Sequence, residues 1–332
     1  MQKYLIWDFG KQFAREPVLR RMKNGDLICT FLTGGPTEPH NENMTVMSRS
    51  TDDGKTWSRP ETIIRHSSRG VWCTELFTEC ERPFLVVMTY NAECHYRELE
   101  TFRSFTDDDG KTWREPVSFP NGLTGVTLRQ GIVMSNHEWL FPMYWQETRG
   151  RFDWQGEHFS AEWPFCCAAA VSCDEGATFQ RFGYLKNGKG LWEPNCVEWE
   201  NGHIIMLMRD NECACLKRSD SYDYGRTWCE PFTTDMENPN TKLTLLKVKE
   251  KILLINNFNR ETGWSSRTHL EVRVSGDGLK SFSRRLPLEN SEECWFYPHA
   301  FADSSRKMVY IAYENAHEHR LAKIPFDELG LT

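Results

Sequence analysis

The chain has 332 residues and a net charge of −7, and its lysines and arginines are scattered rather than clustered. We therefore expect no nucleic-acid partner, because nucleic-acid-binding domains concentrate basic residues on one surface. We also expect no membrane partner, since no stretch approaches the roughly 18 uninterrupted apolar residues that span a bilayer.

The amino terminus lacks a long apolar run, so the sequence predicts no signal peptide. Twelve cysteines without an export signal fit a reducing compartment, and we expect a cytoplasmic protein. Cys213-x-Cys215 and Cys166-Cys167 lack metal-ligand spacing. We therefore expect neither a metal nor another cofactor, and the sequence leaves the oligomeric state open.

An eight-residue motif, S-x-D-x-G-x-T-W, recurs along the chain. Its copies are residues 50–57, 106–113, 172–179, 221–228 and a degraded fifth at 275–282. The fifth copy keeps the Asp and an aromatic residue but moves the Gly. Repeats spaced about 50 to 65 residues apart are typical of solenoids and propellers.

Between these boxes, six apolar runs follow turn residues and are predicted second arms of β-hairpins. They are residues 27–31, 84–90, 139–145, 204–208, 252–257 and 308–313. Six such units predict an all-β fold, a six-bladed β-propeller with four antiparallel strands per blade. We expect one domain over residues 1–332, with residues 4–7 returning as the outermost strand of the last blade to close the ring.

The propeller topology predicts which face each feature occupies. The start of strand 1, the end of strand 2 and the 2–3 loop share one mouth of the axial channel, whereas the boxes lie at the opposite mouth. We therefore interpret the boxes as scaffold, in which Asp accepts backbone N–H bonds and Gly takes a positive φ.

Polar residues at the predicted mouth form an unusual set. We expect six of them to converge on one axial pocket: Arg15, Arg129, Arg209, Arg260, Glu193 and Tyr297. His299 shares the Tyr297 strand face and is a further candidate to contact a substrate. For Arg129, the alternative is that it pairs with Glu75.

These residues resemble the motifs of the sialidase superfamily of Asp-box propellers. Ala14-Arg15-Glu16-Pro17 looks like that family's Arg-Ile-Pro motif, with Glu16 in place of Ile. Glu193, followed by Arg209, is similar to its catalytic Glu and second arginine. Arg260 matches the third arginine, and Tyr297 falls where the family's nucleophilic Tyr lies.

The resemblance implies an exo-acting glycoside hydrolase for a carboxylate-bearing sugar, sialic acid or a related acid. Three guanidiniums can hold one substrate carboxylate through charge-assisted, bidentate bonds. A Tyr hydroxyl stays neutral beside an anionic sugar until Glu193 takes its proton, and it can then attack the anomeric carbon.

The family's acid/base Asp has no counterpart, because residues 37–43 contain no Asp. Glu38 and His40 are the candidates for proton transfer, and Glu42 is a third candidate, which we also expect to contact the sugar. This departure leaves two alternatives open. One is a lyase on uronic-acid glycans with His40 or Tyr297 as base, and the other is a lectin-like propeller that binds an acidic glycan without turnover.

The long loop at residues 146–164 carries Trp154, His158 and Trp163. Loops of this length in a compact domain are usually functional. Its aromatic residues either stack on sugar rings or pack the loop onto the propeller.

Overall fold

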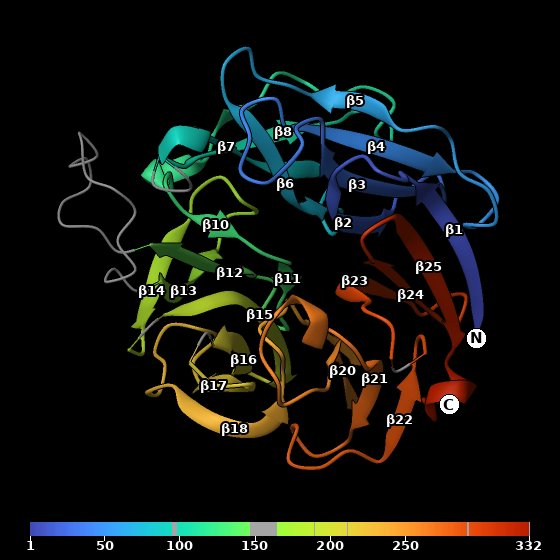
Figure 1. Cartoon of the computed structure of the whole chain (residues 1–332). Helices are drawn as coiled ribbons and strands as arrows, with labels where there is room; N and C mark the ends of the chain where they lie inside the picture. Colours follow the sequence, from blue (N-terminus) through green and yellow to red (C-terminus); the bar gives the residue numbers. More distant parts are fainter. Residues whose placement is uncertain (95–97, 147–164, 189, 211, 291, 332) are drawn as a thin grey trace.

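The structure is a computed structural model, which describes residues 1–94, 98–146, 165–188, 190–210, 212–290 and 292–331. Six antiparallel sheets surround a central axis, as Figure 1 shows. The predicted six-bladed propeller with four strands per blade is confirmed, and the one departure is that the first strand of the third blade is split in two.

Each of the first three blades runs outward from the axis in chain order. Blade 1 contains β2 (Ala14–Arg21), β3 (Leu27–Thr33), β4 (Met44–Ser50) and β5 (Glu61–Ile64). Blade 2 contains β6 (Gly70–Phe77), β7 (Phe84–Tyr90), β8 (Glu100–Phe105) and β9 (Val117–Ser118). Blade 3 contains β10 (Thr127–Leu128), β11 (Ile132–Val133), β12 (Trp139–Gln146), β13 (Phe165–Ser172) and β14 (Gln180–Leu185).

The last three blades follow the same order, except that the last one borrows its outer strand from the amino terminus. Blade 4 contains β15 (Leu191–Glu200), β16 (His203–Asp210), β17 (Cys215–Ser221) and β18 (Phe232–Glu237). Blade 5 contains β19 (Thr244–Val248), β20 (Lys251–Asn257), β21 (Leu270–Ser275) and β22 (Arg284–Pro287). Blade 6 contains β23 (Phe296–Asp303), β24 (Met308–Glu314), β25 (Glu318–Pro325) and β1 (Gln2–Asp8).

The ring closes through β1, which pairs antiparallel with β25. The predicted closure by residues 4–7 is therefore confirmed, and β25 does not present an open edge.

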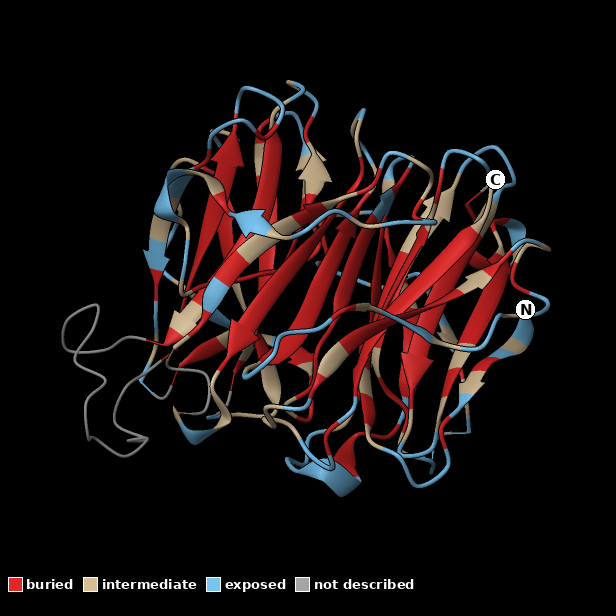
Figure 2. Ribbon diagram, turned by 90° about the horizontal axis from the view of Figure 1, so that it is seen from above, coloured by how far each residue is buried: buried red, intermediate tan, exposed pale blue. Residues whose placement is uncertain are grey.

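Burial is lowest in the outermost strand of each blade. All seven residues of β3 are buried, whereas β5 and β22 are mostly exposed or half-buried. Second strands such as β3 and β7 are packed on both faces, so they are apolar almost continuously, which is the pattern expected for a doubly covered strand. Figure 2 shows buried strands between exposed loops at the two ends. The core lies between neighbouring blades: Phe31 and Val46 of blade 1, for example, cluster with Tyr310 and Leu321 of blade 6.

The repeat boxes form self-contained turns. In the first box, Asp52 accepts hydrogen bonds from the backbone N–H groups of Lys55 (3.0 Å) and Thr56 (2.9 Å). Gly54 has φ 84° and donates its N–H to the Ser50 hydroxyl at 2.8 Å. The degraded fifth box keeps these bonds, since Leu279 takes the Gly position at φ 68° and donates to Ser275 at 2.9 Å.

Strand register places the boxes at the end of the blade away from the predicted pocket. In blade 1, Arg21 pairs with Leu27, which in turn pairs with Ser50 at the start of the box. At the other end, Ala14 pairs with Thr33. The predicted separation of the two faces is therefore confirmed.

Short 3₁₀ helices complete the described part of the chain: η1 (Ala92–Cys94), η2 (Pro120–Gly122), η3 (Trp264–Ser266) and η4 (Asp327–Leu329). Within the described residues, none of the helices has the length and apolar character needed to cross a bilayer.

Candidate active site

Three first strands carry the same irregularity at the mouth of the channel. In β2, β15 and β23 the register shifts, so that two residues of the first strand oppose one residue of the second strand. The residue inside each bulge precedes a proline and has a positive φ: Glu16 (56°), Glu193 (44°) and Tyr297 (53°). Such a backbone costs about 1–3 kcal/mol per residue and is concentrated at functional sites.

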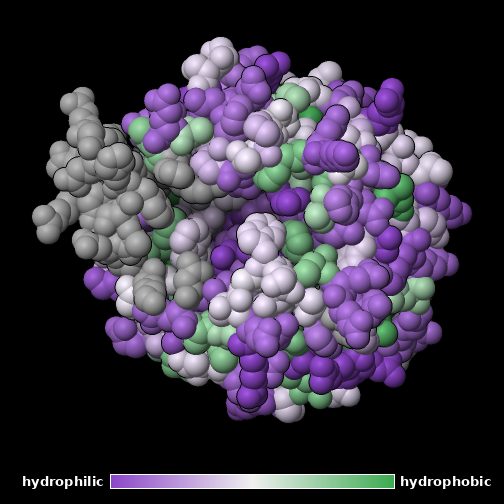
Figure 3. All heavy atoms as spheres, in the orientation of Figure 1, coloured by the Kyte–Doolittle hydropathy of each residue, from purple (hydrophilic) through white to green (hydrophobic). Residues whose placement is uncertain are grey.

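These bulge residues line one cavity of about 330 Å³. The other charged residues in its lining are Arg15, Glu38, Arg209 and Arg267, and its aromatic residues are Phe13, Trp72, Tyr144, Trp145, Phe165, Trp192 and Trp264. A cavity of this size and composition suits a small polar ligand with an apolar face. On the face viewed in Figure 3, the centre of the ring is a hollow with a hydrophilic floor.

Arg209 connects the two residues with candidate catalytic roles. Its Nη1 donates to Glu193 Oε2 at 2.9 Å and to Tyr297 Oη at 3.4 Å. Burial would raise the pKa of Glu193, but the cations Arg209 and Arg129 outweigh it and hold that pKa below its ordinary value. Burial, with the Glu193 charge adding to it, raises the pKa of Tyr297 well above its ordinary value. The resting site therefore holds an ionised Glu193 beside a neutral Tyr297.

Two further arginines line the same cavity. Arg15 lies with its Cζ 4.9 Å from the centroid of the Phe13 ring. Arg267 is 6% exposed, and its Cζ lies 3.9 Å from the Trp264 ring and 5.2 Å from the Tyr297 ring. Arg267 Nε and Nη1 have no hydrogen-bond partner among the described residues. Free donors of this kind are suited to bind an anionic ligand.

Arg260 does not join this cluster, so the expected convergence is wrong for that residue. Its side chain is 77% exposed, and its Nε pairs with Glu237 Oε1 at 2.7 Å. Both Arg260 and Arg267 belong to the loop between β20 and β21. Arg267 lies near the start of β21, where the chain returns to the mouth, whereas Arg260 lies in solvent.

The three acid/base candidates from the loop between β3 and β4 separate in the structure. Glu38 is half-buried and lines the cavity. His40 and Glu42 are not among the described lining residues; Glu42 is 69% exposed and donates its backbone N–H to His40 Nδ1 at 3.2 Å. Of the three, Glu38 is the one that the fold places at the site.

Arg129 lies beneath the cavity and pairs with Glu16 rather than with the Glu75 alternative. Its Nη1 is 3.0 Å from Glu16 Oε2, and both side chains are almost fully buried. Lys242 Nζ lies 3.8 Å from the same oxygen. The floor of the site is thus one carboxylate between two cations.

His299 lies deeper still, where it is 3% exposed and is not among the described lining residues. Its Nδ1 accepts the backbone N–H of Leu19 at 3.1 Å, and its Nε2 lies 3.4 Å from Glu75 Oε2. Burial, together with nearby Arg20, lowers the pKa of His299 well below its ordinary value. The expected contact of His299 with a substrate is therefore wrong, because His299 lies below the cavity as a buried, neutral side chain.

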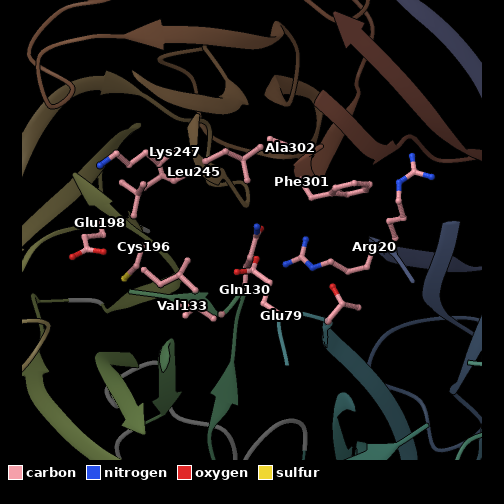
Figure 4. Close-up of a pocket in the computed structure, with 16 residues that line it drawn as sticks. Arg20, Glu79, Gln130, Val133, Cys196, Glu198, Leu245, Lys247, Phe301 and Ala302 are labelled. Atoms are coloured by element: carbon pink, nitrogen blue, oxygen red, sulfur yellow. The ribbon is translucent and has the colours of Figure 1, made fainter. Parts of the chain in front are cut away.

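A second cavity, of about 510 Å³, lies at the opposite mouth (Figure 4). Arg20 and Phe301 line it from first strands, Gln130 lies just before β11, and Thr78 and Glu79 come from the turn between β6 and β7. It contains none of the bulge residues, and the buried His299 and Glu75 lie close to Arg20 on the channel axis. The two mouths are thus chemically distinct.

Sequence reasoning missed Glu16, Lys242 and Arg267 as site residues. Glu16 carried a signal, because it precedes Pro17 as Glu193 precedes Pro194 and as Tyr297 precedes its own proline. Lys242 carried none, since its place depends on the packing of a long side chain across blades. The predicted roles of Trp154, His158 and Trp163 concern residues outside the part of the chain that the structure describes. Among the described residues, no three His, Cys, Asp or Glu side chains group as metal ligands.

Residues 25–311 match the family model of the BNR repeat-like domain. A sialidase from Bacteroides fragilis (strain YCH46) is 22% identical over 316 residues. The match covers 82% of this chain and 54% of that relative, so the chain spans about half the length of the curated protein.

Solved structures of low identity share the fold. The Hadza microbial sialidase Hz136 superposes with a TM-score of 0.76 at 18% identity, covering 96% of this chain and 67% of that one. A protein of unknown function from Dyadobacter fermentans DSM 18053 gives 0.75 at 14% identity, with 97% of both chains covered. Trypanosoma rangeli sialidase in complex with the inhibitor DANA gives 0.69 at 18% identity, covering 96% and 56%. The chain belongs to the BNR repeat-like domain family.

Proposed function

We propose that the protein is an exo-acting glycoside hydrolase for a carboxylate-bearing sugar. The observation that carries the proposal is the contact of Arg209 with both Glu193 (2.9 Å) and Tyr297 (3.4 Å) inside a cavity that Arg15 and Arg267 also line. The sialidase name of the Bacteroides fragilis relative supports the same reaction class.

Arg15, Arg209 and Arg267 hold the carboxylate of the sugar. Arg267 has two unpaired buried nitrogens, and Arg209 Nε is also unpaired among the described residues. A carboxylate that accepts these donors replaces unsatisfied groups with charge-assisted bonds. Because Arg209 also contacts Tyr297, the bound carboxylate lies next to the tyrosine hydroxyl, which favours a sugar whose carboxylate is close to its anomeric carbon.

The first chemical step forms a bond between Tyr297 Oη and the anomeric carbon. The tyrosine proton passes to Glu193, the bond from the anomeric carbon to the leaving oxygen breaks, and Glu38 protonates that oxygen. In the second step Glu38 takes a proton from water, the water oxygen bonds to the anomeric carbon, and Tyr297 leaves and regains its proton from Glu193. The anomeric configuration is retained.

The resting charges oppose an early proton transfer, because the pKa of Glu193 is lowered and that of Tyr297 is raised. The transfer therefore accompanies the attack, when positive charge develops on the sugar. An anionic substrate offsets the arginine charge that now stabilises the Glu193 carboxylate. Binding of the anionic substrate thus raises the proton affinity of Glu193, the base in this step.

The test is a panel of 4-methylumbelliferyl glycosides of sialic acids and uronic acids, with products identified by NMR. The proposal expects release of methylumbelliferone and the free acidic sugar with retained configuration. Absorbance from a new carbon–carbon double bond would instead indicate a lyase. Saturable binding of the acidic glycan without any product would indicate a lectin-like propeller.

A further inference from the structure

Lys242 is a buried cation that the proposed reaction does not yet use. It lies just before β19 and is 3% exposed, and its Nζ has no hydrogen-bond partner among the described residues. The same Nζ lies 5.3 Å from the centroid of the Tyr297 ring and 3.8 Å from Glu16 Oε2. A buried ammonium with unsatisfied donors is costly, so its presence needs a physical reason.

Pairing with Glu16 does not account for Lys242. Glu16 already has a closer partner in Arg129, at 3.0 Å against 3.8 Å. Burial lowers the pKa of Lys242 and the neighbouring charge of Arg129 adds to that effect, whereas Glu16, Glu314 and Glu193 act in the opposite direction. A neutral side chain of similar length would fill the space without this penalty.

Tyr297 is the neighbour whose charge changes during the proposed reaction. As its proton leaves for Glu193, negative charge moves from the carboxylate onto the phenol ring. Arg209 contacts both partners, so it favours the charge on either one. Lys242 interacts with the ring of Tyr297, and a cation near an aromatic ring is held more strongly when that ring gains electron density.

Two cations, Lys242 and Arg267, lie near the Tyr297 ring. A bound substrate affects the charge of only one of them. Arg267 Cζ lies 5.2 Å from the ring centroid, but Arg267 lines the cavity, where a bound carboxylate shares its charge. Lys242 is not among the described lining residues, so a substrate carboxylate in the cavity does not pair with it. The charge of Lys242 therefore continues to act on its buried neighbours. During turnover, Lys242 is therefore the cation whose field remains directed at Tyr297.

We infer that Lys242 is a positioning residue of the nucleophile: it holds the Tyr297 ring from the channel side and stabilises the charge that the ring gains during attack. The inference rests on the proposed function, since it assumes that Tyr297 attacks the sugar. It assigns a catalytic reason to a buried charge that the fold alone does not require.

The test compares Lys242→Met with Lys247→Met, the same change at the opposite mouth, where Lys247 is exposed and lines the second cavity. For Lys242→Met we expect kcat to fall by at least about 10-fold while KM stays within about twofold, since a transition-state interaction is lost. Labelling of Tyr297 by an activated fluorinated acidic sugar should slow by the same factor. Lys247→Met should match the wild type in both measurements.

Lys242→Gln is the second variant, because it keeps hydrogen-bond donors without the charge and protects the test if the Met variant folds poorly. It should lose kcat as Met does. A lowered melting temperature with unchanged kcat per folded molecule, in either variant, would make Lys242 purely structural and overturn the inference. A wild-type protein that neither turns over nor labels with any glycoside would instead refute the proposed function itself.

Discussion

The two ends of the blades use their polar side chains in different ways. At the box end, Asp52 is half-buried and accepts hydrogen bonds from residues of its own turn, at most four positions away. At the mouth, Glu193, Tyr297 and Arg267 come from three blades, with Glu193 and Tyr297 on a strained backbone around a cavity. The repeated box, whose bonds are local, therefore builds the ring. The strained mouth residues line the cavity in which we propose that the chemistry takes place.

The strongest way to break this comparison is to remove the nucleophile. Tyr297→Phe should lower kcat by about 1000-fold or more, because no other described hydroxyl contacts Arg209 beside Glu193. The ring packing is kept, so the melting temperature should stay within about 2 °C of the wild type. Steady-state kinetics and thermal unfolding check both statements, and a kcat near that of the wild type would contradict the role.

The arginines offer a matched pair. Arg267→Ala should raise KM by about 100-fold, since a buried charge-assisted contact with the substrate carboxylate is lost. Arg260→Ala, in the same loop but 77% exposed, should leave KM unchanged. Substrate titrations of the two variants decide the assignment, and equal effects would show that the cavity does not bind the carboxylate.

The acid/base assignment can be sharpened through the leaving group. Glu38→Gln should lower kcat/KM about 100-fold for an alkyl glycoside, which needs protonation as it departs, and much less for a nitrophenyl glycoside. His40→Gln is the control, because His40 is not among the described lining residues. If the two variants had interchanged effects, proton transfer would belong to His40.

The smallest effect on activity is expected at the box end. Hydrogen bonds, led by that from the Thr56 backbone, lower the pKa of Asp52 to about 2. An acid with a lowered pKa stabilises the fold above its unfolded value of about 4, and that contribution is lost as pH falls toward 2. Asp52→Asn should therefore lower the melting temperature at neutral pH and flatten its acid dependence.

The same variant tests the separation of the two ends. Turnover per folded Asp52→Asn molecule should equal that of the wild type, because the box lies at the other end of the blade. A fall in kcat for well-folded protein would show that the box end contributes to the chemistry.

The fold followed from the sequence because its signals are local. A box of eight residues and a turn before an apolar run each define a hairpin, and counting them gave the blade number. The split of the first strand of blade 3 into β10 and β11 had no such signal, since it depends on how residues 129–131 leave the sheet.

The site followed only in part, because convergence depends on packing across blades. The sequence predicts four of the cavity residues correctly: Arg15, Arg209, Glu193 and Tyr297. Each lies on a first strand or on the second strand paired with it, and counting the hairpins locates these strands in the sequence. The sequence predicts Arg260 and does not indicate Arg267, because position within an irregular loop cannot be counted in that way. The side chain of Lys242 extends to Glu16 beneath the cavity, and no local sequence pattern indicates that contact.

The most direct test of the account is to trap the covalent intermediate. The protein is incubated with an activated fluorinated sugar derived from its best acidic substrate, then digested, and the modified peptide is identified by mass spectrometry. The account predicts one sugar attached to Tyr297, with Tyr297→Phe unlabelled. A sugar attached to Glu193 or Glu38, with turnover intact in Tyr297→Phe, would contradict it.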